Sequence, residues 1–208
     1  MTTQTPTRPT DPAGRPQPHG DEDAATATSR EVVAGYFAAA DGVLENPHVF
    51  QLDAFDAGVG EAMDRAIAGV DTVIMGRVTY DQWAGYWPTA EDEFKDFINP
   101  VAKHVASRTR TGALAWENSR LIDGDLLDAV RGLKAQPGGR IAVSGSLSIA
   151  RQLAYAGMLD ELVLVVHPVL AGTGRRLTQE GDSALPLRLV RHDITEKGNA
   201  VLTYRLGA

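Results

Sequence analysis

The chain of 208 residues contains no cysteine. This absence excludes disulfides, thiolate metal sites and a cysteine nucleophile. The chain also has no run of about 18 consecutive apolar residues, so we expect no segment to cross a membrane. The N-terminal region lacks the apolar core of a secretory signal, and we therefore expect a cytoplasmic protein.

Basic residues are too few to predict a nucleic-acid partner. The 20 Lys and Arg residues are outnumbered by 27 Asp and Glu residues, which gives a net charge of −7, whereas binding to a phosphate backbone needs clustered positive charge. The five histidines show no metal-ligand spacing, so no metal site is predicted. Arg77 and Arg108 follow apolar segments, where each can hold a phosphorylated ligand; for Arg175 and Arg176, solvated strand ends explain the position equally well.

Large apolar residues are missing from the first 28 positions. This segment contains no Val, Ile, Leu, Phe, Tyr or Trp but holds five of the eleven prolines. Such a segment buries too little apolar surface to offset the entropy of ordering. We therefore predict a disordered tail over residues 1–28 and a single domain over residues 29–208.

The body of the chain alternates between strand and helix patterns. Apolar runs bounded by turn residues indicate strands at 31–38, 73–75, 103–107, 113–116, 140–143, 162–166, 187–194 and 200–206. Helical spacing or capping indicates helices at 57–69, 79–86, 91–98, 126–133 and 147–154. This alternation predicts an α/β fold with a mostly parallel central sheet and flanking helices. The last two strands are joined by a short turn at 196–199, which predicts a C-terminal antiparallel hairpin.

The segment from Val73 to Tyr80 runs from a short apolar strand into Gly76, Arg77 and Thr79. A glycine there allows a ligand to approach the backbone closely, and an arginine can bind a phosphate with two hydrogen bonds. Free amides at the start of the following helix can hold an anion. An ordinary turn also explains the pattern.

A second strand-to-helix corner lies at Ser144, Gly145 and Ser146, with a helix beginning near Leu147. Amides at such a helix start can face a pyrophosphate. The corner lacks the complete G-x-G-x-x-G pattern of a Rossmann fold, and a closely packed turn between strand and helix is the alternative.

Aromatic side chains cluster at Tyr80, Trp83, Tyr86 and Trp87, just before Pro88. Trp83 and Trp87 are candidates for a flat wall that binds a heterocyclic substrate. A core or dimer contact is the alternative, because aromatic side chains bury large areas wherever they lie. His167 precedes a proline at the end of an apolar strand, where a structural role is expected.

Four segments together resemble the dihydrofolate-reductase-like superfamily: residues 73–80, 103–109, 139–148 and 160–177. Within it, the chain is most similar to the C-terminal reductase domain of the bacterial bifunctional riboflavin deaminase-reductase, over residues 30–206. The resemblance implies a mostly parallel eight-stranded sheet, NADPH as cofactor, a small-molecule substrate and assembly as a homodimer.

The resemblance also implies roles for particular residues. The phosphates of NADPH are assigned to Gly76, Arg77, Val78 and Thr79. The adenosine and its 2′-phosphate are assigned to Ser107, Arg108 and Thr109. The pyrophosphate corner is assigned to Ser144, Gly145, Ser146 and Leu147. Two arginines at neighbouring strand ends suit NADPH better than NADH, for which an acidic residue normally binds the ribose hydroxyl.

The implied activity is hydride transfer from NADPH to a C=N or C=O group of a small heterocyclic or sugar-like substrate. It is similar to the reduction of 5-amino-6-(5-phosphoribosylamino)uracil in riboflavin biosynthesis. The place where a dihydrofolate reductase carries its acid falls on Gly60, so folate reduction is disfavoured and a catalytically silent or regulatory NADPH-binding homodimer is the alternative. The candidate proton donors are Asp41, for which an Asp-Gly turn is the alternative role, and Glu61, on the first helix, with an ordered water equally able to serve.

Overall fold

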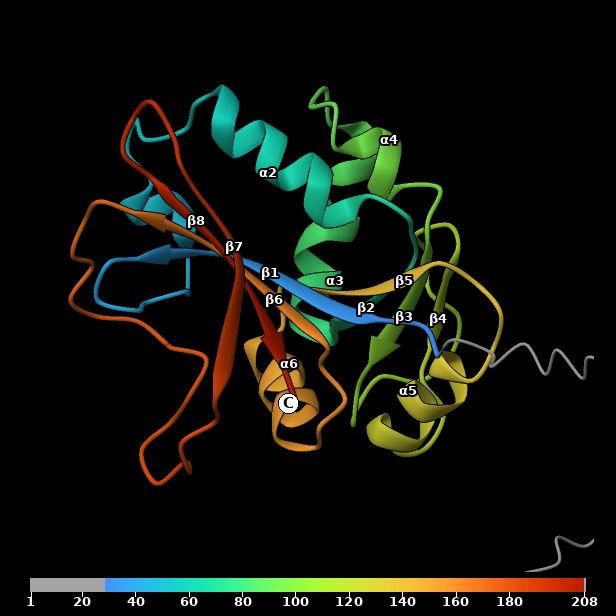
Figure 1. Cartoon of the computed structure of the whole chain (residues 1–208). Helices are drawn as coiled ribbons and strands as arrows, with labels where there is room; N and C mark the ends of the chain where they lie inside the picture. Colours follow the sequence, from blue (N-terminus) through green and yellow to red (C-terminus); the bar gives the residue numbers. More distant parts are fainter. Residues whose placement is uncertain (1–28, 208) are drawn as a thin grey trace, which may run out of the picture.

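A computed structural model describes residues 29–207 and contains an eight-stranded sheet with helices on both faces (Figure 1). The predicted tail over residues 1–28 lies outside the described residues. The strands are β1 (Val32–Ala39), β2 (Val70–Gly76), β3 (Ala102–Ala106), β4 (Ser119–Leu121), β5 (Arg140–Ser144), β6 (Glu161–His167), β7 (Leu187–Ile194) and β8 (Ala200–Leu206). The helices are α1 (Pro47–Phe50), α2 (Ala57–Ile67), α3 (Arg77–Ala84), the 3-10 helix η1 (Trp87–Thr89), α4 (Lys95–Ile98), α5 (Leu126–Lys134) and α6 (Leu147–Tyr155).

The strand order is β4-β3-β2-β5-β1-β6-β8-β7. The first six strands in this order run parallel, and β8 and β7 are added as an antiparallel pair. The predicted mostly parallel sheet with a C-terminal hairpin is thus confirmed. The carboxyl ends of β2, β3 and β5, which are neighbours in parallel register, lie together at one edge of the sheet.

Strand β1 shows why helices cover both faces of the sheet. Its residues alternate between two cores, as the period of two along a strand requires. Ala34 and Tyr36 pack in the core that contains the apolar side chains of α5 and α6, whereas Val33 packs with α3 and α4. Phe37 packs beside α2. In Figure 1, α2 and α4 accordingly lie above the sheet, and α5 and α6 lie below it.

Three local predictions were wrong. Residues 113–116 form no strand, and the edge strand is β4 instead. Trp116 is buried in the core. Its backbone N–H donates to the Tyr80 hydroxyl at 3.0 Å and its indole N–H donates to Asn99 Oδ1 at 2.9 Å, so both polar groups are satisfied outside a sheet. The helix predicted over 91–98 is confined to α4, and α1 was missed because four residues give no helical period. No helix among residues 29–207 has the length and hydropathy that crossing a membrane requires.

Candidate functional site

The turns that follow β2 and β5 are packed against each other. A Cβ atom added to Gly76 would lie 2.8 Å from Ser146 Oγ, and one added to Gly145 would lie 2.5 Å from Thr79 Cγ2. Gly145 also has a φ of +78°, which favours glycine. The two glycines therefore let the two turns interlock, and we call residues 76–79 and 144–147 together the double turn.

Two helices begin at the double turn without a side-chain cap. At neither Gly76 nor Ser146 does a side chain accept a hydrogen bond from the first turn of the helix that follows, α3 or α6. By contrast, Asp56 caps α2 and Asp125 caps α5 through backbone N–H groups. The amides at the start of α3 and α6 thus lack a side-chain acceptor, and free amides at helix starts favour an anion.

A third turn, after β3, contributes hydroxyl and guanidinium groups. Ser107 Oγ accepts hydrogen bonds from the backbone N–H groups of Thr109 at 3.2 Å and Arg110 at 2.8 Å, which fixes the turn. Arg108, which lies between Ser107 and Thr109 in this turn, is exposed. Arg77 Nη1 donates to Asp81 at 2.9 Å, and Arg110 pairs with the same carboxylate. Asp81 therefore holds two arginines beside the double turn, one of which, Arg110, sequence reasoning missed.

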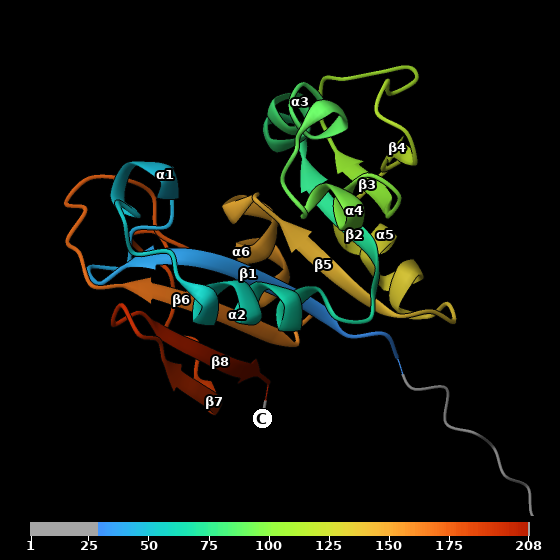
Figure 2. The same ribbon diagram turned by 90° about the horizontal axis from the view of Figure 1, so that it is seen from above.

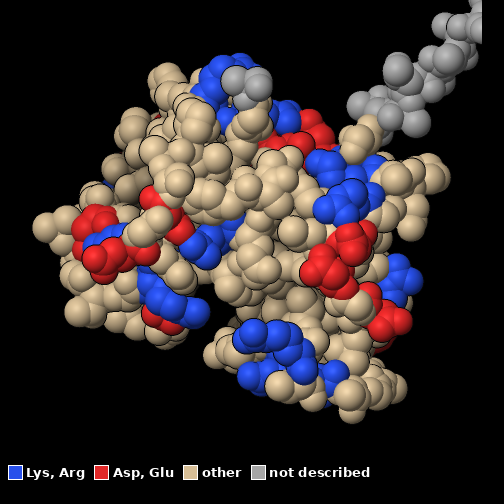
Figure 3. Space-filling view, turned by 90° about the horizontal axis from the view of Figure 1, so that it is seen from below, with Lys and Arg blue, Asp and Glu red and all other residues tan. Residues whose placement is uncertain are grey.

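One cleft of about 1670 Å³ joins these turns. All eleven residues assigned to the cofactor line it, namely Gly76, Arg77, Val78, Thr79, Ser107, Arg108, Thr109, Ser144, Gly145, Ser146 and Leu147. From above, the elements divide into a lobe with α1 and a lobe with α3 (Figure 2). From below, the surface is hollowed between two lobes, with Lys and Arg side chains on both rims (Figure 3).

The structure does not bring the two predicted proton donors into this cleft. Asp41 accepts hydrogen bonds from the backbone N–H groups of Gly172 at 2.7 Å and Ala171 at 3.3 Å, and the bond from Gly172 is the main cause that lowers its pKa. Its carboxylate thus fastens a loop. Glu61 is exposed on α2 and lies 3.6 Å from Arg65, one turn along the helix. Both residues are absent from the cleft lining.

The side of α2 that faces the cleft is apolar, with Ala62, Met63, Ala66 and Ile67 in its lining. Gly60 does not line it, and a Cβ atom at Gly60 would meet no atom within 4 Å. The turn of helix where a dihydrofolate reductase carries its acid therefore presents no carboxylate to this cleft.

Three carboxylates that sequence reasoning did not select do line the cleft. Each already accepts hydrogen bonds: Glu45 from Arg175 at 2.7 Å, Asp92 from the backbone N–H of Phe94 at 2.8 Å, and Asp125 from the first turn of α5. They orient loops and a helix. Among residues 29–207, no group of three or more His, Asp or Glu side chains is placed to hold a metal ion.

The predicted aromatic wall forms one side of the cleft. The rings of Trp83 and Trp87 meet edge to face with centroids 5.9 Å apart, and Phe94 lies 4.9 Å from Trp87. These three side chains and Tyr86 line the cleft. Tyr80 is instead part of the core, with 1% of its surface exposed. We call Trp83, Trp87 and Phe94 the aromatic wall.

Elements far away in the sequence form the remaining lining. Phe37, Gln51 and Phe55 reach the cleft from β1, the end of α1 and the loop before α2. Behind them, His167 is completely buried and its ring stacks on Phe37 with centroids 5.6 Å apart, in keeping with the expected structural role. No local sequence pattern indicated these residues.

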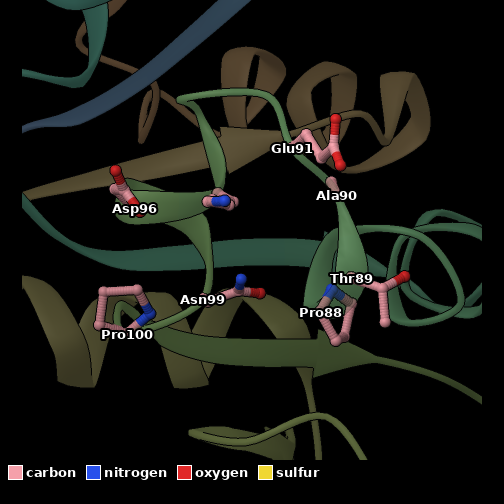
Figure 4. A pocket seen from close by; sticks show the side chains of 8 residues that line it. Pro88, Thr89, Ala90, Glu91, Asp96, Asn99 and Pro100 are labelled. Carbon is pink, nitrogen blue, oxygen red and sulfur yellow. The ribbon is translucent and has the colours of Figure 1, made fainter.

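A second, shallower hollow of about 600 Å³ lies between η1 and α4 (Figure 4). Its lining includes Pro88, Glu91, Lys95, Asp96 and Pro100. These residues carry charges of both signs, and none of the residues assigned to the cofactor lines it. We assign no function to this hollow.

The strand order and the flanking helices give this chain a dihydrofolate-reductase-like fold. Among proteins with this fold, the family model described as the RibD C-terminal domain matches residues 30–201. The chain belongs to the RibD C-terminal domain family, which is a family of reductase domains.

Individual relatives agree with this assignment. The chain is 29% identical over 141 residues to the uncharacterized protein YyaP of Bacillus subtilis, covering 65% of this chain and 73% of the relative. A putative riboflavin biosynthesis protein from Shewanella sp. PV-4 superposes with a TM-score of 0.66 at 20% identity, covering 86% of this chain and 99% of that one. A dihydrofolate reductase from Enterococcus faecalis, in complex with NADP(H), gives a TM-score of 0.55 at 12% identity, covering 86% and 97%. At these identities the two structures demonstrate a shared fold.

Proposed function

We propose that the protein is an NADPH-dependent reductase that transfers hydride to a C=N or C=O group of a small heterocyclic or sugar-like substrate. The double turn is the observation that carries this proposal. It places two uncapped helix starts side by side at the carboxyl edge of a parallel sheet, where α/β proteins bind nucleotides. A substrate similar to 5-amino-6-(5-phosphoribosylamino)uracil agrees with the family.

The residues present fit a bound dinucleotide phosphate. Gly76 and Gly145 leave the backbone uncovered where any Cβ atom would collide with the facing turn. Amides of the double turn would hold the pyrophosphate, with Arg77 beside them. Arg108 and the Ser107 turn would hold the 2′-phosphate, because a guanidinium binds phosphate with two parallel hydrogen bonds. The NADP(H) complex of the related fold supports the same choice of cofactor.

When bound, NADPH supplies a hydride to an electrophilic carbon of the substrate. The aromatic wall and Phe37, on different elements of the cleft, provide flat apolar surfaces for a heterocycle and exclude water from it. Since the carboxylates that line the cleft already accept hydrogen bonds, we propose that water delivers the proton to the substrate heteroatom.

The same lack of a free acid supports a second candidate, a catalytically silent or regulatory NADPH-binding protein. Both candidates share the double turn and differ in turnover. Oxidation of NADPH in the presence of dihydrofolate and the ribosylaminouracil intermediate separates them: turnover of the second substrate supports the reductase, and binding without any turnover supports the silent form.

Titration with NADPH and NADH, followed by calorimetry, tests the cofactor assignment. Arg108→Ala is expected to lower the affinity for NADPH about tenfold, which corresponds to about 1.4 kcal/mol for a lost phosphate contact. The affinity for NADH is expected to stay the same. Arg131→Ala is the matched control, because Arg131 is an exposed arginine on α5 whose one ion pair within residues 29–207 is with Asp128. Arg77→Ala is expected to weaken both nucleotides through the shared pyrophosphate.

Equal losses for NADPH and NADH in Arg108→Ala would show that Arg108 does not bind the 2′-phosphate. Failure of the wild-type protein to bind either nucleotide would overturn both candidate functions. Calorimetry reports these outcomes without any catalytic turnover.

We also propose a cytoplasmic homodimer, for which the edge strand β7 offers a surface. Its side chains are largely exposed and include Leu187, Leu189 and Val190, each more than 40% exposed. Apolar residues on an unpaired edge favour pairing with another chain. Light scattering is expected to give the mass of two chains, and Leu189→Lys is expected to give one; a monomeric wild-type protein would overturn the proposal.

A further inference from the structure

A buried chain of polar groups connects the β7–β8 hairpin to the cleft. His167 and Asn199 are both 0% exposed, and His167 Nδ1 lies 2.6 Å from Asn199 Oδ1. On the other side of the imidazole ring, His167 Nε2 lies 3.4 Å from Gln51 Nε2. Gln51 lines the cleft, so this chain of three side chains ends there.

The direction of each hydrogen bond in this chain follows from its inner end. Asn199 Nδ2 donates to the backbone carbonyl of Ala54 at 2.7 Å, and a carbonyl can only accept. Asn199 Oδ1 therefore faces His167 and accepts from Nδ1. The amide nitrogen of Gln51 can only donate, so His167 Nε2 is the acceptor of that hydrogen bond and the ring hydrogen is on Nδ1.

This order leaves one end of the Gln51 amide free. Its nitrogen is held by His167, and its Oε1 forms no hydrogen bond within residues 29–207. Since Gln51 lines the cleft, the group that it has left for a ligand there is a hydrogen-bond acceptor.

The segment that carries Gln51 is held in an unusual backbone conformation. Asn46 and Leu52, on either side of α1, have φ values of 51° and 48°, a region that non-glycine residues rarely adopt. Such strain persists where the surroundings fix the backbone, and it concentrates at binding sites. The carbonyl of Ala54, bound by Asn199, is one of these fixing contacts.

We propose that His167 is a positioning residue that orients Gln51 so that the cleft selects ligands carrying an N–H or O–H donor. The proposal deepens the reductase function above and rests on it for the identity of the cleft as the substrate site. A ring N–H of a heterocycle held by the aromatic wall is the group that Gln51 Oε1 would bind.

The first test reads the imidazole directly. Long-range nitrogen–proton NMR spectra of the full chain, with His167 assigned by the signals that disappear in His167→Phe, are expected to show hydrogen on Nδ1 and none on Nε2. If His167→Phe does not fold, His19→Gln, His48→Gln, His104→Gln and His192→Gln assign the other four histidines, which leaves the His167 signals by elimination. Hydrogen on Nε2 of His167 would overturn the proposal, whatever the cofactor result.

The second test uses uracil and 1,3-dimethyluracil as probes, with binding followed by tryptophan fluorescence with and without NADPH. The wild-type protein is expected to bind uracil about tenfold more tightly, the value of one good hydrogen bond. Gln51→Glu keeps an acceptor but has no N–H to donate to His167 Nε2, so it is expected to reduce the preference, as loss of the His167 contact should. Gln51→Met has a similar size without an acceptor and is expected to lose it, while the affinity for NADPH stays the same in all variants.

A preference that survives in Gln51→Met would be steric and would overturn the proposal, as would equal or absent binding of the two probes. His167→Phe is expected to reduce the preference because it frees the Gln51 amide to rotate. If His167 had only a structural role, His167→Phe would lower the affinity for both probes equally. Loss of NADPH binding by the wild-type protein would instead count against the proposed function and leave the probe ratio readable.

Discussion

The two ends of the cleft are built in different ways. The nucleotide end, formed by the double turn and the Ser107 turn, consists of short contiguous segments at the ends of neighbouring strands. The substrate end, formed by the aromatic wall, Phe37 and Gln51, draws on elements that are distant in the sequence. In the proposed function, the nucleotide end would bind mainly through backbone and glycine geometry, whereas the substrate end would depend on side chains oriented by buried partners.

This difference explains which end sequence reasoning found. A phosphate needs amides and a close approach, and both follow from a glycine at the end of a strand. A specific substrate needs side chains converging from several elements, and convergence is a property of the fold. Variants at each end should therefore fail in different ways.

The largest expected effect is at the nucleotide end. Gly76→Ala should lower the affinity for NADPH about a hundredfold, equal to about 2.7 kcal/mol. The reason is that the new Cβ atom would lie 2.8 Å from Ser146 Oγ and push the two turns apart. Gly76 has a φ of −82°, which alanine adopts freely, so the fold should persist. Calorimetric titration measures the loss, and circular dichroism verifies folding.

Gly60→Ala is the matched control, since a Cβ atom at this helical glycine meets nothing within 4 Å. It should leave the affinity for NADPH unchanged and stabilise the protein by about 0.5 to 1 kcal/mol. Ser146→Gly added to Gly76→Ala should restore part of the affinity. Unchanged affinity in Gly76→Ala would show that the interlocked turns do not matter for binding.

An intermediate effect is expected from pH, through a histidine in β3, the strand that precedes the Ser107 turn. His104 on β3 is buried and accepts hydrogen bonds from Arg120; burial first, and then Arg120, lower its pKa from 6.5 to about 4. The unfolded chain therefore binds a proton below pH 6.5 that the folded chain does not bind, so the free energy of unfolding falls as the pH drops below 6.5, and the loss reaches about 2 kcal/mol near pH 5.

Urea unfolding at several pH values should show this loss in the wild-type protein and a smaller one in His104→Gln. His192→Gln, at an exposed histidine, should follow the wild type. Identical pH profiles for His104→Gln and the wild type would remove His104 as the cause.

The smallest effect is expected at the substrate end. Leu52→Gly should stabilise the protein by about 0.5 kcal/mol, because Leu52 is 78% exposed with a φ of 48° and glycine relieves the strain. Val49→Gly, at an exposed helical position in α1, should destabilise it by about 0.5 to 1 kcal/mol. Thermal unfolding measures both, and a destabilised Leu52→Gly would mean that the leucine side chain contributes more than its backbone strain costs.

Much of the fold could be predicted from local patterns. The strands 31–38 and 140–143 were placed within one residue at each end, because long apolar runs beside turn residues leave few alternatives. Residues 113–116 were misassigned because their apolar side chains are typical of a strand. In the structure the backbone N–H of Trp116 donates instead to the side chain of Tyr80, which belongs to another element. Tertiary contacts of that kind leave no periodic signal in the sequence.

The residues of the candidate site also differ in whether a local pattern or a distant contact determines them. Gly76 and Gly145 were found because each ends an apolar strand and begins a helix. Asp41 was selected for its place in a turn, but the bond from Gly172, 131 residues away, directs its carboxylate to a loop. Gln51 was missed because its orientation depends on His167, 116 residues away.

The sequence alone determined the alternating α/β architecture, the antiparallel hairpin and the three turns of the nucleotide end, because strand period, glycine and turn residues act within a few positions of the chain. Only the tertiary structure decided that Gly76 and Gly145 interlock with the opposite turn, that Asp41 and Glu61 lie outside the cleft, and that Gln51 lines the cleft beside His167. Those outcomes depend on packing and hydrogen-bond partners that the fold brings together across more than a hundred residues.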